Sequence, residues 1–312
     1  MRRWLSVIAN DSLLFLTAVI WGVAFVAQRV GMAHVGPFTY NAVRFAIGSL
    51  TLVPIILLRR RPAPSPRVPR PAGPRVWTGG LLAGAVLFLG ASLQQSGLVY
   101  TTAGKAGFIT GLYVVLVPLT GLFRRQRAGW GGWVGAFLSL IGLFLLSVSD
   151  RFTMEKGDML VLASALFWTA HVHVVGWLSP RTDPLALACI QFAVCATLCA
   201  AGAFLTESVR AAGILEAAVP ILYGGLLSVG VAFTLQVVAQ AKAPPAHAAV
   251  ILSLESVFAA LGGALILSER LGARGTLGCS IMFAGTLFSQ VPRLLGCPRL
   301  GRPRLVSPGA AR

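Results

Sequence analysis

The stretch from Ala246 to Leu271, AHAAVILSLESVFAALGGALILSERL, decides the fold class of this chain. It is apolar and helix-compatible, and it exceeds the roughly 20 helical residues that cross a hydrocarbon core about 30 Å thick. Glu255 lies near its middle. A charge at that depth costs at least about 2.5 kcal/mol, so an intramembrane carboxylate usually faces a protein interior or a water-filled path. The stretch therefore predicts a membrane span with a buried carboxyl group.

The bulk composition supports the same class. Of the 312 residues, 56% are hydrophobic and only 11% are charged, and the mean hydropathy is +0.80. These values exclude an ordinary soluble globular protein and predict a polytopic protein embedded in a lipid bilayer. The net charge of +17 does not indicate a nucleic-acid partner, because the basic residues lie in short segments between apolar runs and no recognition motif accompanies them.

Ten apolar segments follow one another, each near the length that a bilayer demands. They are Leu13–Met32, Pro37–Leu58, Trp77–Tyr100, Thr102–Leu122, Trp130–Ser149, Met159–Ser179, Pro184–Thr206, Ala217–Gln240, Ala246–Leu267 and Gly275–Val291. If the N-terminus is cytoplasmic, cytoplasmic segments hold 18 of the basic residues and the opposite face holds five. Since Lys and Arg are enriched in cytoplasmic loops, both termini are expected in the cytoplasm.

The sequence contains two copies of a five-helix unit. A shift of 147 residues aligns Trp21 with Trp168, and a shift of 142 aligns Gln94 with Gln236. Because five is odd, the second copy must enter the membrane from the opposite side, which predicts inverted repeats, a transporter signature. The expected organisation is a cytoplasmic N-terminus at 1–12, a first repeat at 13–149, a connecting loop at 150–158, a second repeat at 159–291 and a basic cytoplasmic tail at 292–312.

From about residue 13 to 291, the chain resembles the EamA family of ten-helix carriers in the drug/metabolite transporter superfamily. The resemblance is carried by Trp21-Gly22, Arg44-Phe45, LVYTTAGKAGFITGLYVVLVP from Leu98 to Pro118, Gly157-Asp158, and LSLESVFAALGGALILSERL from Leu252 to Leu271. It implies a bacterial plasma-membrane carrier of small organic metabolites or amino acids, with export as the expected direction. Such proteins often have Glu-Pro in the ninth span, whereas this chain has Glu255-Ser256, which leaves a kink there open.

Four distinctive side chains are expected near the bilayer midplane, where carriers with inverted repeats hold substrate. Counting about 1.5 Å per residue from each predicted helix start brings Trp21, Tyr113, Trp168 and Glu255 to this level. The alternative for the aromatic rings is plain packing between helices. Glu255 either binds a proton or a cationic group, or it forms a fixed hydrogen bond or ion pair that holds two helices together.

Arg44 and His171 complete the candidate substrate-binding set. Arg44 lies roughly 6 Å above Glu255 by the same helical rise, so we expect it to pair with Glu255 or with a substrate carboxylate. His171 follows Trp168 by three residues on the same helix face, whereas His173 points about 200° away. The two histidines cannot form a metal pair on a regular helix, and no metal is predicted.

Other polar residues in the spans have simpler expected roles. The amides of Gln94, Gln95, Gln191 and Gln236 are interpreted as hydrogen-bonding groups between helices. Lys105 lies near the outer interface, where its side chain can reach water, and its repeat mate His247 lies near the inner interface.

Two competing function classes are a passive channel and an integral membrane enzyme. The run AGKAG at 103–107 lacks the first glycine and the final Ser or Thr of a phosphate-binding loop, so no ATP site or other cofactor is predicted. No nucleophile with a base, carboxylate cluster or metal-ligand set shares one depth band, so we expect a secondary transporter rather than an enzyme. The expected partners are the bilayer and a small-molecule substrate, and a homodimer remains open.

Overall fold

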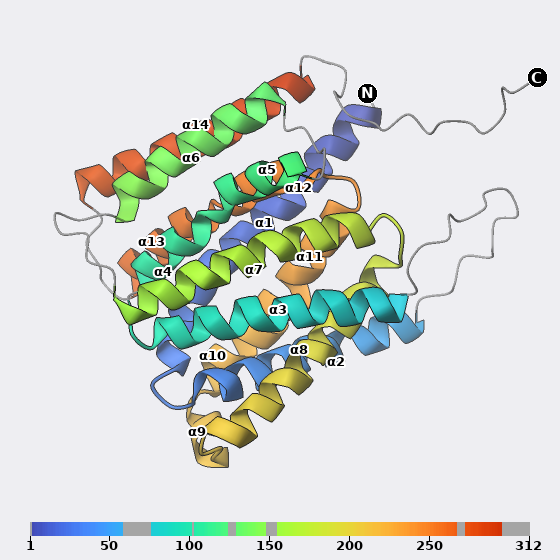
Figure 1. Ribbon diagram of the computed structural model, residues 1–312, viewed down its shortest axis with the longest axis vertical. Coiled ribbons are helices and arrows are strands. Elements are labelled where there is room, and N and C mark those ends of the chain that lie inside the picture. Colours follow the sequence, from blue (N-terminus) through green and yellow to red (C-terminus); the bar gives the residue numbers. More distant parts are fainter. Residues whose placement is uncertain are drawn as a thin grey trace, which may run out of the picture.

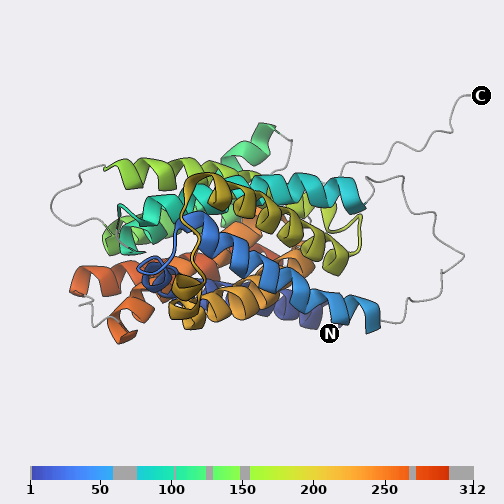
Figure 2. The same ribbon diagram turned by 90° about the horizontal axis from the view of Figure 1, so that it is seen from below.

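The computed structural model describes residues 2–58, 76–101, 103–123, 129–147, 155–266 and 272–294. The predicted basic loop at 59–75, Glu269, the Lys105 side chain and the tail beyond residue 294 lie outside these described residues. Every regular element in the described part is a helix, and Figures 1 and 2 show the long helices running alongside one another.

The elements of the first half are α1 (Arg2–Gly31), α2 (Pro37–Leu58), α3 (Val76–Leu98), α4 (Ala103–Gly111), α5 (Tyr113–Phe123) and α6 (Trp130–Ser147). Those of the second half are α7 (Lys156–Leu178), α8 (Pro184–Thr206), α9 (Ala211–Glu216), α10 (Ala218–Leu222), the π-helix η1 (Tyr223–Phe233), α11 (Thr234–Gln240), α12 (Pro245–Leu252), α13 (Glu255–Ile266) and α14 (Ala273–Leu294).

Eight helical stretches of the described residues are long and apolar enough to cross a membrane. They are Ile8–Gly31, Pro37–Leu58, Val76–Leu98, Ala106–Phe123, Lys156–Leu178, Pro184–Thr206, Ala218–Gln240 and Pro245–Ile266. Helix α6 contributes a shorter apolar stretch, Trp130–Leu145. The chain is therefore an all-helical, multi-pass membrane protein, and the number of ten spans stays a prediction that depends on α6 and α14.

The helix bounds repeat along the chain. The shift of 147 residues brings α2 onto α8, and the shift of 142 brings α3 onto the continuous run from α10 to α11. Packing follows the same correspondence, since α1 packs on α12 and α13 as α7 packs on α4 and α5. Helices α2 and α8 run antiparallel, because Phe38 lies against Gly202 while Ser49 donates a hydrogen bond to the Cys189 carbonyl oxygen.

Two spans are interrupted at repeat-equivalent points. Leu112 separates α4 from α5, and Ser253 with Leu254 separates α12 from α13. Neither break contains a proline. The ninth span is therefore interrupted immediately before Glu255 even though Ser256 stands where a proline was expected from the family. Tyr113 and Glu255 consequently occupy the same place, the first residue of the second half-helix.

Helices α6 and α14 form a close pair along one edge of the bundle (Figure 1). A Cβ atom at Gly142 would meet the Gly278 carbonyl oxygen, and one at Gly135 would lie 2.9 Å from the Gly285 carbonyl oxygen. Small residues of this kind let helix backbones approach closely in a membrane. The pairing runs antiparallel and is self-consistent under the repeat, because the shift of 143 residues relates Gly135 to Gly278 and Gly142 to Gly285.

Candidate functional site

A small cavity lies between the two halves of the chain, and helices from both contribute to its wall. Its volume is about 40 Å³. The lining includes five of the six predicted site residues, namely Trp21, Arg44, Tyr113, Trp168 and Glu255. These residues stand on α1, α2, α5, α7 and α13, so the depth argument brings together side chains from helices that are far apart in sequence.

The carboxyl group of Glu255 and the hydroxyl group of Tyr113 face the same part of the cavity. Both residues are almost fully buried, with 4% and 3% of their surfaces exposed. The two groups are close enough to interact electrostatically, but neither Tyr113 Oη nor Glu255 Oε1 makes a hydrogen bond of good geometry to a described residue. Buried polar atoms are usually hydrogen-bonded, so water or a bound molecule is the natural partner here.

Arg44 is held in place without an acidic partner among the described residues. It is 2% exposed, and its Nε donates a hydrogen bond of 2.9 Å to Asn41 Oδ1, while Asn41 Nδ2 donates to the Ala91 carbonyl oxygen. The guanidinium carbon lies 4.9 Å from the centroid of the Phe45 ring. Arg44 forms no ion pair with Glu255, and its two Nη groups make no hydrogen bond to the described residues. The charge therefore remains free to meet a ligand.

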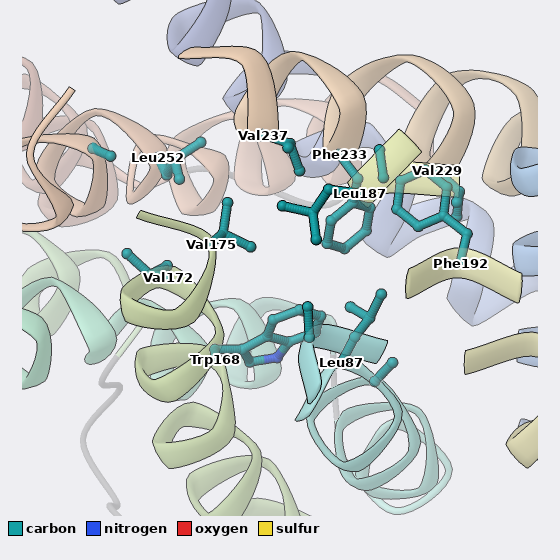
Figure 3. Packing of buried hydrophobic residues seen from close by; sticks show 14 of the residues in the cluster. Leu87, Trp168, Val172, Val175, Leu187, Phe192, Val229, Phe233, Val237 and Leu252 are labelled. Atoms are coloured by element: carbon teal, nitrogen blue, oxygen red, sulfur yellow. The ribbon is translucent and has the colours of Figure 1, made fainter. Parts of the chain in front are cut away.

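Three aromatic rings pack against one another in the apolar part of the cavity wall. Phe233 on η1 has its ring centroid 4.5 Å from that of Trp21 and 5.9 Å from that of Trp168. Trp21 Nε1 donates to the Ser228 carbonyl oxygen at 3.3 Å, whereas Trp168 Nε1 has no partner among the described residues. Figure 3 shows Trp168 and Phe233 pointing into the same apolar cluster from α7 and η1. The repeat related the two tryptophans but gave no signal for Phe233, whose mate is Ala91.

His171 does not line the cavity. It is fully buried, its Nε2 lies 3.0 Å from Gln191 Oε1, and its ring contacts the edge of Trp168 at 6.0 Å between centroids. His171 therefore packs against Trp168 from outside the cavity. His173 contacts Thr120 Oγ1 on another side of α7, as the helical geometry predicted. Within the described ranges, no three His, Cys, Asp or Glu residues come together to hold a metal ion.

Two glutamines interpreted as links between helices also line the cavity. Gln94 and Gln236 are repeat mates, and both contribute to its wall together with Gln28. Gln94 Nε2 donates to Thr110 Oγ1 at 3.1 Å, while the Oε1 atoms of Gln236 and Gln28 have no partner among the described residues. The hydrogen bonds of Gln94 to Thr110 and of Gln191 to His171 join different helices and fit the original interpretation. The cavity therefore combines one arginine, one carboxyl group, several amides and five aromatic side chains.

Comparison with known proteins places this arrangement in a family. The chain matches the EamA-like transporter family twice, over residues 9–148 and 155–290. It is 33% identical to an uncharacterized transporter of Archaeoglobus fulgidus over 262 residues, which cover 82% of this chain and 77% of the relative. It is 29% identical to an uncharacterized protein of Pseudomonas aeruginosa over 271 residues, which cover 84% of this chain and 87% of that protein.

A solved crystal structure of a protein shares the fold. The two align with a TM-score of 0.73 and 20% sequence identity, over 92% of this chain and 99% of that one. The long apolar helices indicate that the protein is embedded in a lipid bilayer, and the two family matches cover most of the sequence. The chain therefore belongs to the EamA-like transporter family of drug/metabolite transporters and is a multi-pass membrane transporter of small molecules.

Proposed function

We propose that this protein is a secondary carrier that moves small organic metabolites or amino acids by alternating access, with export as its direction. The observation that carries the proposal is the cavity, where repeat mates from the two halves meet around an arginine that has no acidic partner in the described part of the chain. The pairs are Trp21 with Trp168, Gln94 with Gln236, and Tyr113 with Glu255. A site shared between repeats near the middle of the spans is where such carriers bind substrate.

Each group of side chains in the cavity has a separate proposed role in substrate binding. Arg44 presents Nη donors to the cavity, and a guanidinium group binds a carboxylate through paired, charge-assisted hydrogen bonds. Glu255 takes a proton or the cationic group of a substrate, with the Tyr113 hydroxyl beside it. The rings of Trp21, Trp168 and Phe233 contact the apolar part of the substrate. This set suits a small molecule that has a carboxylate at one end and an apolar body.

The size of the cavity supports alternating access over an open pore. About 40 Å³ holds a few water molecules, whereas sites for organic ligands usually measure 300–1,000 Å³. Substrate entry therefore requires the helices to move apart. The breaks at Leu112 and at Ser253 are the proposed flexing points, because each interrupts a span beside a cavity residue. The antiparallel contacts of α2 with α8 and of α6 with α14 support inverted repeats.

Counterflow in proteoliposomes tests this function. Proteoliposomes that contain the wild-type protein are loaded with a pool of unlabelled amino acids and organic acids. Uptake of each labelled compound is then followed across a pH series. We expect at least one compound to be carried, and Glu255→Gln to remove the pH dependence of its transport. Arg44→Gln should raise the KM for compounds that bear a carboxylate by at least about tenfold, as expected for the loss of a buried charge-assisted pair.

Glu216→Gln serves as the matched control, because Glu216 is an acid with 63% of its side chain exposed, well away from the cavity wall. It should leave counterflow and its pH profile unchanged. Transport by Glu255→Gln with the wild-type pH profile would make Glu255 a structural residue. Absence of counterflow for every compound in the pool would count against the proposed substrate class.

A further inference from the structure

A histidine–carboxylate contact joins two helices of the cavity wall at a distance from the cavity itself. His247 on α12 and Asp11 on α1 meet with Nε2 2.8 Å from Oδ1. Their side chains are only 8% and 17% exposed. The contact links residues 236 positions apart in sequence, and it joins the helix that carries Trp21 to the half-helix directly before Glu255.

The pair lies toward one end of the cavity-forming helices. Asp11 precedes Trp21 by ten residues, and His247 precedes Glu255 by eight, which correspond to about 15 Å and about 12 Å of helix. By the distribution of basic residues, this is the predicted cytoplasmic end of the bundle. A path from the cavity to the cytoplasm between α1 and α12 must therefore pass this contact.

The repeat places matching residue types at the opposite end. The shift of 147 residues relates Asp11 to Asp158 on α7, and the shift of 142 relates His247 to position 105, a lysine on α4. Asp158 precedes Trp168 by ten residues and is 1% exposed. Its Oδ1 accepts a hydrogen bond of 2.5 Å from Thr101 Oγ1, in the segment that leads into α4. Each end of the cavity thus has an acid on one helix and a basic residue in the first turn of a broken span.

We propose that the Asp11–His247 contact and, at the opposite end, the contact of the repeat-related Asp158 with Thr101 are the two gates of the transport path. The inference rests on the proposed alternating-access function and adds its gating residues. The Asp11–His247 contact closes the cytoplasmic end by holding α12 against α1, and Asp158 closes the other end by holding α4 against α7. Opening one end breaks one contact while the other holds. Polar contacts of this kind suit the role because their partners, near the membrane surface, regain water when they separate.

Labelling of a cysteine in the cavity tests the gates without any transported compound. Ser228 lines the cavity, so Ser228→Cys is introduced into a chain whose five native cysteines are replaced. A charged, membrane-impermeant methanethiosulfonate reagent is applied to inside-out and right-side-out vesicles. We expect Asp11→Asn to raise the labelling rate at least about threefold from the cytoplasmic face only. Asp158→Asn should raise it by a similar factor from the opposite face only.

Two further variants separate gating from general loosening of the fold. Glu216→Gln breaks another histidine–carboxylate contact, His34 with Glu216 at 3.2 Å, which joins no cavity helix to a broken span. It should change neither labelling rate. Exchange of the pair, Asp11→His with His247→Asp, should return the cytoplasmic rate to that of the parent chain.

The proposal fails if Asp11→Asn and Asp158→Asn increase labelling from the same face, or if Glu216→Gln does as much as either. It also fails if neither variant changes the rate, or if the exchanged pair labels as fast as Asp11→Asn. Opposite-face effects in a protein without counterflow activity would retain the gates while rejecting the proposed substrates. Counterflow without these effects would reject the gates alone.

Discussion

The ring of Phe233 lies between the two tryptophans of the cavity and also contacts Phe45 and Phe192, each at 6.0 Å between centroids. Phe233→Ala would remove the ring from the centre of this cluster and leave a void that the rigid helices fill only in part. We expect the free energy of unfolding to fall by about 3–5 kcal/mol, which is typical for a buried phenylalanine. The midpoint of thermal unfolding in detergent, followed by tryptophan fluorescence, measures the change.

Phe204→Ala is the control for this substitution, because Phe204 is 79% exposed on α8 and loses few protein contacts. Its midpoint should stay close to that of the wild type. Equal midpoints for the two variants would show that Phe233 is not a packing centre. Since Ala91 occupies the repeat-equivalent position, the fold accepts a small side chain there, and the expected loss at Phe233 belongs to its particular neighbours.

Sequence reasoning identified those cavity-lining residues whose depth and residue type are both unusual. Glu255, Tyr113 and the two tryptophans could be identified because charge and large rings at mid-span are costly or rare, and because the repeat pairs them. Depth gives no information on the direction of a side chain around its helix. Helix face is an equally coarse guide: His171, three residues after Trp168 on the same face, is predicted at the cavity but does not line it. Phe233 escaped notice because phenylalanine is ordinary in an apolar span.

At the scale of helices, the α6–α14 contact makes a sharp prediction. In a helix interior, replacement of glycine by alanine normally stabilises by roughly 0.5–1 kcal/mol. At Gly142, however, a Cβ atom would collide with the Gly278 carbonyl oxygen and lie 3.0 Å from the Met282 nitrogen. These are backbone atoms, which cannot move aside without separating the helices. Gly142→Ala should therefore lower the unfolding midpoint in detergent.

Gly129→Ala supplies the comparison, because a Cβ atom at Gly129 would meet nothing within 4 Å. This variant should unfold at the wild-type temperature. If Gly142→Ala is as stable as Gly129→Ala, then the close crossing of α6 and α14 does not form in the protein as described.

The extents of whole helices were predictable where the sequence marks both ends. Pro37–Leu58 and Pro184–Thr206 appear with the predicted bounds, because a proline suits the first turn of a helix and the apolar run then gives the length. The breaks at Leu112 and Ser253 carry no such mark. The sequence likewise gives no sign of the π-helix η1, because its repeat-equivalent segment in α3 is a regular α-helix. These features depend on tertiary packing, which local residue preferences do not report.

At the scale of the whole molecule, the helix contacts between the two halves follow the sequence repeat. Each packing of α1, α2 or α3 on a second-half helix has a repeat-related counterpart, and α2 with α8 and α6 with α14 pair with their own mates. In Figure 1, the start of α1 and the end of α14 lie at the same end of the bundle. Both observations agree with an even number of crossings, but eight and ten crossings satisfy them alike.

The segment at 148–154 between α6 and α7 distinguishes these two topologies. With ten spans and a cytoplasmic N-terminus, five crossings precede it and it lies outside the cell. If α6 and α14 lay along the membrane surface, only four crossings would precede it, and it would be cytoplasmic. We expect ten, because the glycine faces of α6 and α14 bury each other and leave apolar side chains such as Phe137 and Leu287 exposed to lipid.

In a bacterial host, alkaline phosphatase fused after residue 150 should be active, and a green fluorescent protein fused after residue 312 should fluoresce. An inactive phosphatase at residue 150, with a fluorescent C-terminal fusion, would support eight spans and remove the basis for inverting the second repeat.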